Sequence, residues 1–195
     1  MPGVEISVIG DANDGVAKGL CGGTVSIAPP RESALETQVV IGNAALYGPT
    51  GGRLSIAGAA GERFAVRNSG AVAVVEGVGH HGCEYMTNGT VVILGPTGLN
   101  FAAGMTGGAV FAYDPDRALE GRLNSELVGL GGLTDEDEAV LRQLVIDHRT
   151  ATKSRLAARL LARWPESLMS FCRVAPKGDS VIAARPPAEP ARLRA

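Results

Sequence analysis

One short segment of this sequence is rich in glycine, histidine and cysteine. Residues 77–82 read G-V-G-H-H-G and are followed at once by Cys83. The pattern G-x-G-x-x-G is typical of dinucleotide-binding loops, in which the last glycine opens a helix. The residues after Gly82 lead instead into another segment of alternating apolar residues. We therefore interpret these glycines as corners between short strands and not as a pyrophosphate-binding loop.

His80, His81 and Cys83 are residue types that bind metal ions. Successive side chains on an extended strand point to opposite faces, so three such close neighbours do not converge on one point. Cys83 also falls in an apolar row, described below, that should face the core. A cysteine buried among apolar groups is a poor nucleophile, so we expect neither a metal site nor a catalytic thiol here.

Paired carboxylates are the next candidates for chemistry. Glu76 and Asp114 are 38 residues apart, or two periods of the repeat described next, with Gly95 midway. Two rungs of a stacked structure separate them by about 10 Å, too far for the paired acids of a glycoside hydrolase. His81 with Glu62 and Glu84 is the last set that could act catalytically. We expect no catalytic, cofactor-binding or metal site in this chain.

The elements that would position these residues are repeated. Glycine followed by alternating apolar residues occurs five times, at intervals of 29, 18, 19 and 19, with the marker glycines Gly23, Gly52, Gly70, Gly89 and Gly108. Apolar residues follow two positions later at Val25, Leu54, Val72, Val91 and Val110. Others follow four positions later at Ile27, Ile56, Val74, Ile93 and Ala112. Alternation of this kind predicts half-buried strands.

A period of about 19 residues is too short for a strand with a crossover helix, which needs roughly 30 residues. It is long enough for one coil of three short strands. We therefore predict a right-handed parallel β-helix, a solenoid in which equivalent residues stack in rows. A third inward row lies six residues before the marker glycines: Ala17, Leu46, Phe64, Cys83 and Ala102. A protruding loop at residues 29–38 accounts for the longer first interval.

Composition changes near residue 116. Residues 1–116 hold 22 of the 27 glycines and a net charge of −5, whereas residues 117–195 carry +3. We predict a β-helix domain at 1–116, a helical extension at 117–176 that packs on the solenoid, and a disordered tail at 177–195. Thr134 and Ser154 are expected to cap two helices, the second ended by Pro165. Their apolar stripes are Val140, Leu141, Leu144 and Val145, then Leu156, Leu160, Leu161 and Trp164.

Other sequence features bound the environment and partners. The three cysteines have no close pairing, which fits a reducing compartment. No stretch looks like a signal peptide or a membrane span, and the net charge of −2 gives no general attraction to nucleic acid or anionic membrane. We expect a cytoplasmic protein.

Several longer strings resemble a known family. Residues 10–14 (GDAND), 61–70 (GERFAVRNSG), 81–87 (HGCEYMT) and 100–105 (NFAAGM) are similar to the C-terminal GXGXG-repeat domain of the glutamate synthase large (α) subunit. The resemblance covers roughly residues 8–176 and implies a right-handed β-helix. In that family, glutamine supplies ammonia to 2-oxoglutarate with the help of FMN and an iron–sulfur cluster. The resemblance implies that these cofactors belong to partner domains.

The resemblance also implies a role. It suggests a non-catalytic β-helix that links the glutaminase and FMN-binding synthase domains of a glutamate synthase assembly, as an excised domain or as a separate subunit. A second hypothesis is a free-standing GXGXG subunit of another complex, N-methylglutamate synthase-like or formylmethanofuran dehydrogenase-like. A third is an enzyme in its own right that uses His81, Glu62 or Glu84.

Overall fold

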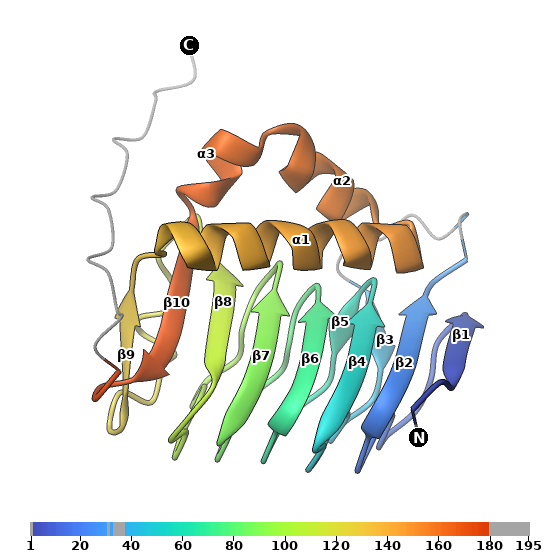
Figure 1. The fold of residues 1–195 in the computed structure, drawn as a ribbon, viewed down its shortest axis with the longest axis horizontal. Helices are drawn as coiled ribbons and strands as arrows, with labels where there is room; N and C mark the ends of the chain where they lie inside the picture. Colours follow the sequence, from blue (N-terminus) through green and yellow to red (C-terminus); the bar gives the residue numbers. More distant parts are fainter. Residues whose placement is uncertain (1, 31, 33–37, 180–195) are drawn as a thin grey trace.

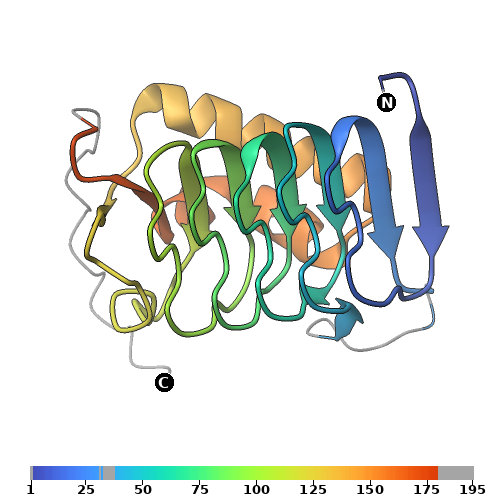
Figure 2. The same cartoon turned by 90° about the horizontal axis from the view of Figure 1, so that it is seen from below.

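The chain folds as a parallel β-solenoid with helices at its C-terminal end. The computed structural model describes residues 2–30, 32 and 38–179. Its main sheet contains β1 (Glu5–Ile9), β2 (Cys21–Ala28), β4 (Gly51–Ile56), β6 (Ser69–Val75), β7 (Asn88–Ile93) and β8 (Ala109–Tyr113), each parallel to the next. Each strand returns through a loop to start the next coil (Figure 2). The predicted fold class is confirmed.

Further strands extend this framework. A small second sheet pairs β3 (Val39–Ile41) with β5 (Ala59–Ala60) on another side of the coils. At the C-terminal end of the main sheet, β10 (Phe171–Pro176) runs antiparallel to β8, and β9 (Val128–Gly131) pairs with β10 (Figure 1). Strands in the region after residue 117 were not predicted from the sequence. They add to the sheet edge beside the last coil.

Two apolar rows run through the solenoid, and both were predicted correctly except in β6. The observed rows are Val25–Leu54–Ala73–Val91–Val110 and Ile27–Ile56–Val75–Ile93–Ala112. The prediction that Val72 and Val74 face inward is wrong, because Val72 pairs with Arg53 and Thr90 on the opposite face. Val72 and Val74 pack instead against the helices outside the sheet.

A β-bulge explains this shift. Gly70 and Ala71 together oppose Gly89, because Ser69 pairs with Asn88 whereas Val72 already pairs with Thr90. The buried Asn68 side chain fills the bulge. Its Oδ1 accepts from Ala71 N at 2.8 Å, and its Nδ2 donates to Ala71 O at 3.0 Å. Ala71, and not Gly70, therefore occupies the position of the marker glycines, and β6 carries the extra residue.

The third side of each coil is not a β-strand, but its backbone still forms hydrogen bonds to the neighbouring coils. Alternate residues there have positive φ, as at Ala44, Leu46 and Gly48, then Arg63, Ala65 and Arg67, then His81, Cys83 and Tyr85, then Asn100, Ala102 and Gly104. Middle members of these runs reach back to the preceding coil: Leu46 N donates to Val16 O at 2.7 Å and Cys83 N to Phe64 O at 2.7 Å. In the third predicted row Ala65 therefore replaces Phe64, although both are buried.

Three helices cover the outer face of the sheet: α1 (Asp135–Thr152), α2 (Arg155–Ala162) and α3 (Trp164–Leu168) (Figure 1). Leu141, Leu144 and Val145 of α1 join a second core with Val92 and Phe111 of the sheet. Thr134 and Ser154 cap α1 and α2 as predicted. The predicted stripe includes Val140 wrongly, since its side chain is exposed.

The end of α2 also differs from the prediction. Pro165 does not simply stop that helix. It lies in the first turn of α3, where a proline costs no intrahelical hydrogen bond. No helix in the described part of the chain is long and apolar enough to cross a membrane.

The inward rows predict how the fold responds to a buried charge. Val91 is fully buried between Ala73 and Val110, so Val91→Asp should cost several kcal/mol of unfolding free energy, enough to unfold a marginally stable domain. Val140→Asp on the exposed face of α1 is the matched control and should change stability by less than about 0.5 kcal/mol. Urea denaturation measures both. Similar unfolding midpoints for the two variants would contradict the inward assignment.

Candidate functional site

A buried polar cluster joins the helices to the corner of the solenoid. Glu76 directly follows β6, His148 lies in α1, and Ser154 precedes α2. His148 Nε2 lies 3.3 Å from Glu76 Oε1, and the Ser154 hydroxyl donates to the same oxygen. All three side chains are buried, and His148 Nδ1 has no hydrogen-bond partner among the described residues.

The arrangement of serine, histidine and carboxylate differs from that of a catalytic triad. In a serine hydrolase the histidine takes the proton of the serine hydroxyl, and the carboxylate lies behind the histidine. Here both Ser154 and His148 contact the carboxylate of Glu76, so His148 does not stand between the serine and the carboxylate and the three groups do not form that relay. The Ser154 oxygen also accepts from Ala157 N at 2.9 Å as the cap of α2. The cluster is built to hold the α1–α2 turn on the solenoid.

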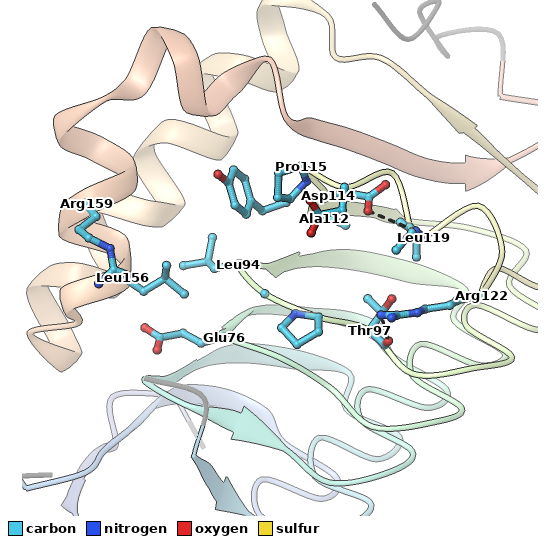
Figure 3. A pocket seen from close by; sticks show the side chains of 15 residues that line it. Glu76, Leu94, Thr97, Ala112, Asp114, Pro115, Leu119, Arg122, Leu156 and Arg159 are labelled. Carbon is cyan, nitrogen blue, oxygen red and sulfur yellow. Dashed lines mark hydrogen bonds between the residues drawn. The ribbon is translucent and has the colours of Figure 1, made fainter. Parts of the chain in front are cut away.

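Glu76 also lines a cavity of about 310 Å³ between the solenoid and α2 (Figure 3). Asp114 lines it too, but the carboxylates of Glu76 and Asp114 point in opposite directions (Figure 3). Asp114 Oδ1 accepts from Leu119 N at 3.2 Å. The prediction that both acids occupy one row is wrong: in the register Val75–Ile93–Ala112, Glu76 lies one residue beyond the row and Asp114 two. The pair does not form an acid–base dyad.

Arg122 closes the other side of the cavity. Its Nη1 donates to Thr97 O at 2.6 Å, which fixes the guanidinium against the corner of a neighbouring coil. The apolar side chains of Leu94 and Leu156 lie near Glu76, on the side of the cavity away from Thr97 and Arg122 (Figure 3). Glu76 and Arg122 thus lie on opposite sides of the cavity.

Both histidines of the glycine-rich segment take part in contacts between and within coils. His80 Nδ1 accepts from Leu99 N at 2.8 Å, one coil further on. The same contact, from a side chain to a backbone N–H of the next coil, recurs along this corner. Asp14 accepts from Asn43 N at 2.7 Å, and the Asn43 side chain accepts from Glu62 N at 2.8 Å. These side chains replace backbone hydrogen bonds at the corner, as expected for a structural role.

His81 forms a polar row on the surface. His81 Nδ1 lies 2.7 Å from Glu84 Oε1, to which Asn100 Nδ2 also donates at 2.9 Å. Asn124 continues the row by donating to Asn100 Oδ1 at 2.9 Å. The predicted candidates His81 and Glu84 are therefore brought together. The side chain of Glu62 is exposed, and no hydrogen bond joins it to His81 or Glu84.

Cys83 is fully buried in the solenoid core. Desolvation raises the pKa of its thiol far above the usual range, so the nucleophilic thiolate does not form at neutral pH. Across residues 2–30, 32 and 38–179, no group of three or more His, Cys, Asp or Glu side chains is placed to hold a metal ion. Those residues therefore do not fit an iron–sulfur cluster, which takes four thiolates.

Of the buried cluster, sequence reasoning had found Ser154 as a helix cap and Glu76 as a possible acid, but it missed His148. The signal was present in the periodicity of α1. Leu141, Leu144 and Val145 form its buried stripe, and His148 follows at the next helical position on the same face. A histidine at that position must find a polar partner across the interface, and Glu76 is that partner.

The stacked coils and their glycine corners define a repeat protein of the solenoid class, and comparison with known proteins gives the family. The family model described as "GXGXG motif" matches residues 1–177. The chain belongs to this family.

Its relatives are glutamate synthases. The chain is 52% identical over 187 residues to Glutamate synthase (NADH) of Schizosaccharomyces pombe, covering 94% of this chain and 9% of that protein. It is 52% identical over 178 residues to the Glutamate synthase (NADPH) large chain of Azospirillum brasilense, covering 90% and 12%. The corresponding large chain of Bacillus subtilis is 46% identical over 179 residues, again covering 90% and 12%. The chain spans about a tenth of the length of these relatives.

The buried cluster predicts a local cost for losing Ser154. Ser154→Ala removes both the cap of α2 and a donor to the buried Glu76, so it should lower the unfolding free energy by about 1–3 kcal/mol. Thr150→Ala is the matched control, because the Thr150 hydroxyl is exposed and bonds only to Ile146 O within α1. Urea denaturation compares the variants. Equal stabilities would show that the cluster does not hold the helices.

Cysteine reactivity tests the burial of Cys83. Cys21 is exposed, whereas Cys83 and Cys172 are buried. A maleimide reagent at neutral pH should modify Cys21 rapidly and the other two only after unfolding in urea. Mass spectrometry of tryptic peptides identifies the sites, and Cys21→Ser should abolish the fast phase. Rapid modification of Cys83 in the folded protein would contradict its place in the core.

Proposed function

We propose that this chain is the structural β-helix of a glutamate synthase assembly and supplies no catalytic group of its own. In this proposal it links the glutaminase domain to the FMN-dependent synthase domain, which together turn glutamine and 2-oxoglutarate into glutamate. The observation that carries the proposal is the identity of 46–52% with glutamate synthases over 90% or more of this chain. We place the assembly in the cytoplasm, which stays a prediction.

The geometry supports a linking role in two ways. The coils are joined on the strand side and on the positive-φ side by hydrogen bonds and by continuous apolar rows, so the body should resist bending. The polar side chains that looked reactive are engaged in holding it: His80 bridges coils, and Glu76 anchors the helices. A stiff body of this kind suits a spacer between domains.

The cofactors in this proposal belong to the partner domains. FMN and an iron–sulfur cluster would be bound there and supply the reducing equivalents. Cys83 and Cys172 are both buried in the apolar core of the solenoid, and Cys172 Sγ lies 3.5 Å from Ala112 O.

Activity measurements test the proposal. The purified chain should bind no flavin and release no ammonia from glutamine. Co-purified with a glutaminase/FMN-synthase polypeptide, the His81→Ala and Glu84→Gln variants should keep kcat within about twofold of wild type, because neither residue contacts the reacting atoms. Glutaminase activity in the isolated chain, or loss of kcat in His81→Ala with an unchanged melting temperature, would contradict the proposal.

The partner separates this proposal from the alternative. Recovery of the native complex should yield a glutaminase/FMN-synthase polypeptide, identified by mass spectrometry and by the absorbance of FMN. Recovery of an N-methylglutamate synthase-like or formylmethanofuran dehydrogenase-like complex would support the free-standing subunit instead.

A further inference from the structure

The two ends of the solenoid are closed differently. Beside the last coil, β10 pairs with β8 and places Cys172 next to Ala112 and Val174 next to Val110. Cys172 and Val174 are fully buried there. At the first coil, β1 is the edge of the sheet, and no described strand lies beyond it (Figure 1).

The inward rows are open at this first coil. Ile6 pairs with Val25 and Val8 with Ile27, so these two residues begin the same rows that are buried further along. Ile6 is nevertheless 48% exposed, compared with 1% for Leu54 two coils later. The cross-section of the core thus faces outward at this end.

The backbone at this end is also arranged for a further strand. Val4 O accepts from Thr24 N at 2.9 Å, so the backbone N–H and C=O groups of Val4 and of every second residue after it point toward β2. In a parallel ladder the other set points the opposite way, so the N–H and C=O groups of Glu5, Ser7 and Ile9 face the open side. Such an edge is a template for another chain in extended conformation.

Charge indicates what kind of strand would fit. Glu5, Asp11 and Asp14 are exposed on this coil, and Lys18 is the one basic residue in residues 2–20. A second copy would bring the same acidic groups against themselves. A strand flanked by lysine or arginine would complement them.

We propose that β1 is a docking edge for one extended strand of a different domain or subunit, with alternating apolar residues that cover Ile6 and Val8 and basic residues that face Glu5 and Asp11. The strand would add to β1 by backbone hydrogen bonds, as β10 adds to β8 at the other end. The proposal rests on the geometry of the first coil and holds whichever complex the chain joins.

A capped peptide in which valine and lysine alternate is the probe. Titration into the isotope-labelled chain, followed by amide NMR, should shift the signals of β1 and slow the hydrogen exchange of Glu5, Ser7 and Ile9. The same peptide with N-methyl groups on every backbone nitrogen keeps its side chains but cannot donate the backbone hydrogen bonds of a strand. It should bind at least about tenfold more weakly.

Protein variants locate the site. Ile6→Lys should weaken binding about tenfold or more, because it adds a charge to the apolar contact and repels the basic peptide. Val140→Lys, an exposed position on α1, should bind like wild type. Ile6→Ala, with the melting temperature checked, distinguishes lost contact from misfolding and should weaken binding by a smaller factor.

Three results would overturn the proposal. The first is no binding by the alternating peptide at millimolar concentration. The second is equal binding by the N-methylated peptide or by Ile6→Lys, which would indicate charge attraction elsewhere. The third is a wild-type dimer by sedimentation that Ile6→Lys converts to a monomer, because a second copy would then cover this edge.

Discussion

The stacking of identical rows of apolar side chains is the constraint on which the rest of the structure depends. Neighbouring coils lie about 4.8 Å apart, so every inward residue touches its equivalents above and below. Leu54, Ala73 and Val91 share one row, and a coil that shifted by one residue would turn that row outward. The coils therefore keep nearly constant length. In β6 the extra residue is accommodated in the bulge that Asn68 fills, and the rows continue past it.

This constraint also explains where the reactive-looking side chains lie. Polar residues cannot enter the rows, so they collect at the corners, where the strand ladder is interrupted and backbone N–H groups need acceptors. His80 accepts from Leu99 N, and Asn43 accepts from Glu62 N. The corner directly after β6 gives the helices their attachment point at Glu76. A site built this way positions large elements relative to one another, which is the basis of the proposed linking role.

The sequence was informative where periodicity alone decides the outcome. It predicted the parallel strands of the main sheet, the rows at Leu54, Val91 and Val110, and both helix caps. It failed at β6, because two adjacent small residues, Gly70 and Ala71, are equally suited to the marker position and only the pairing of Val72 distinguishes them. The positive-φ runs were invisible because alanine and leucine rarely adopt that conformation. The role of His148 depended on a partner 72 residues away.

Native-state hydrogen exchange measured residue by residue tests the stacked solenoid most directly. If the coils form one cooperative body, the amides of Leu46, Ala65, Cys83 and Ala102, which donate to the preceding coil from residues of positive φ, should be protected as strongly as those of β6 and β7. They should also exchange through the same global opening. Exchange of these four amides at the rate of exposed loops, while the strands stay protected, would contradict the account.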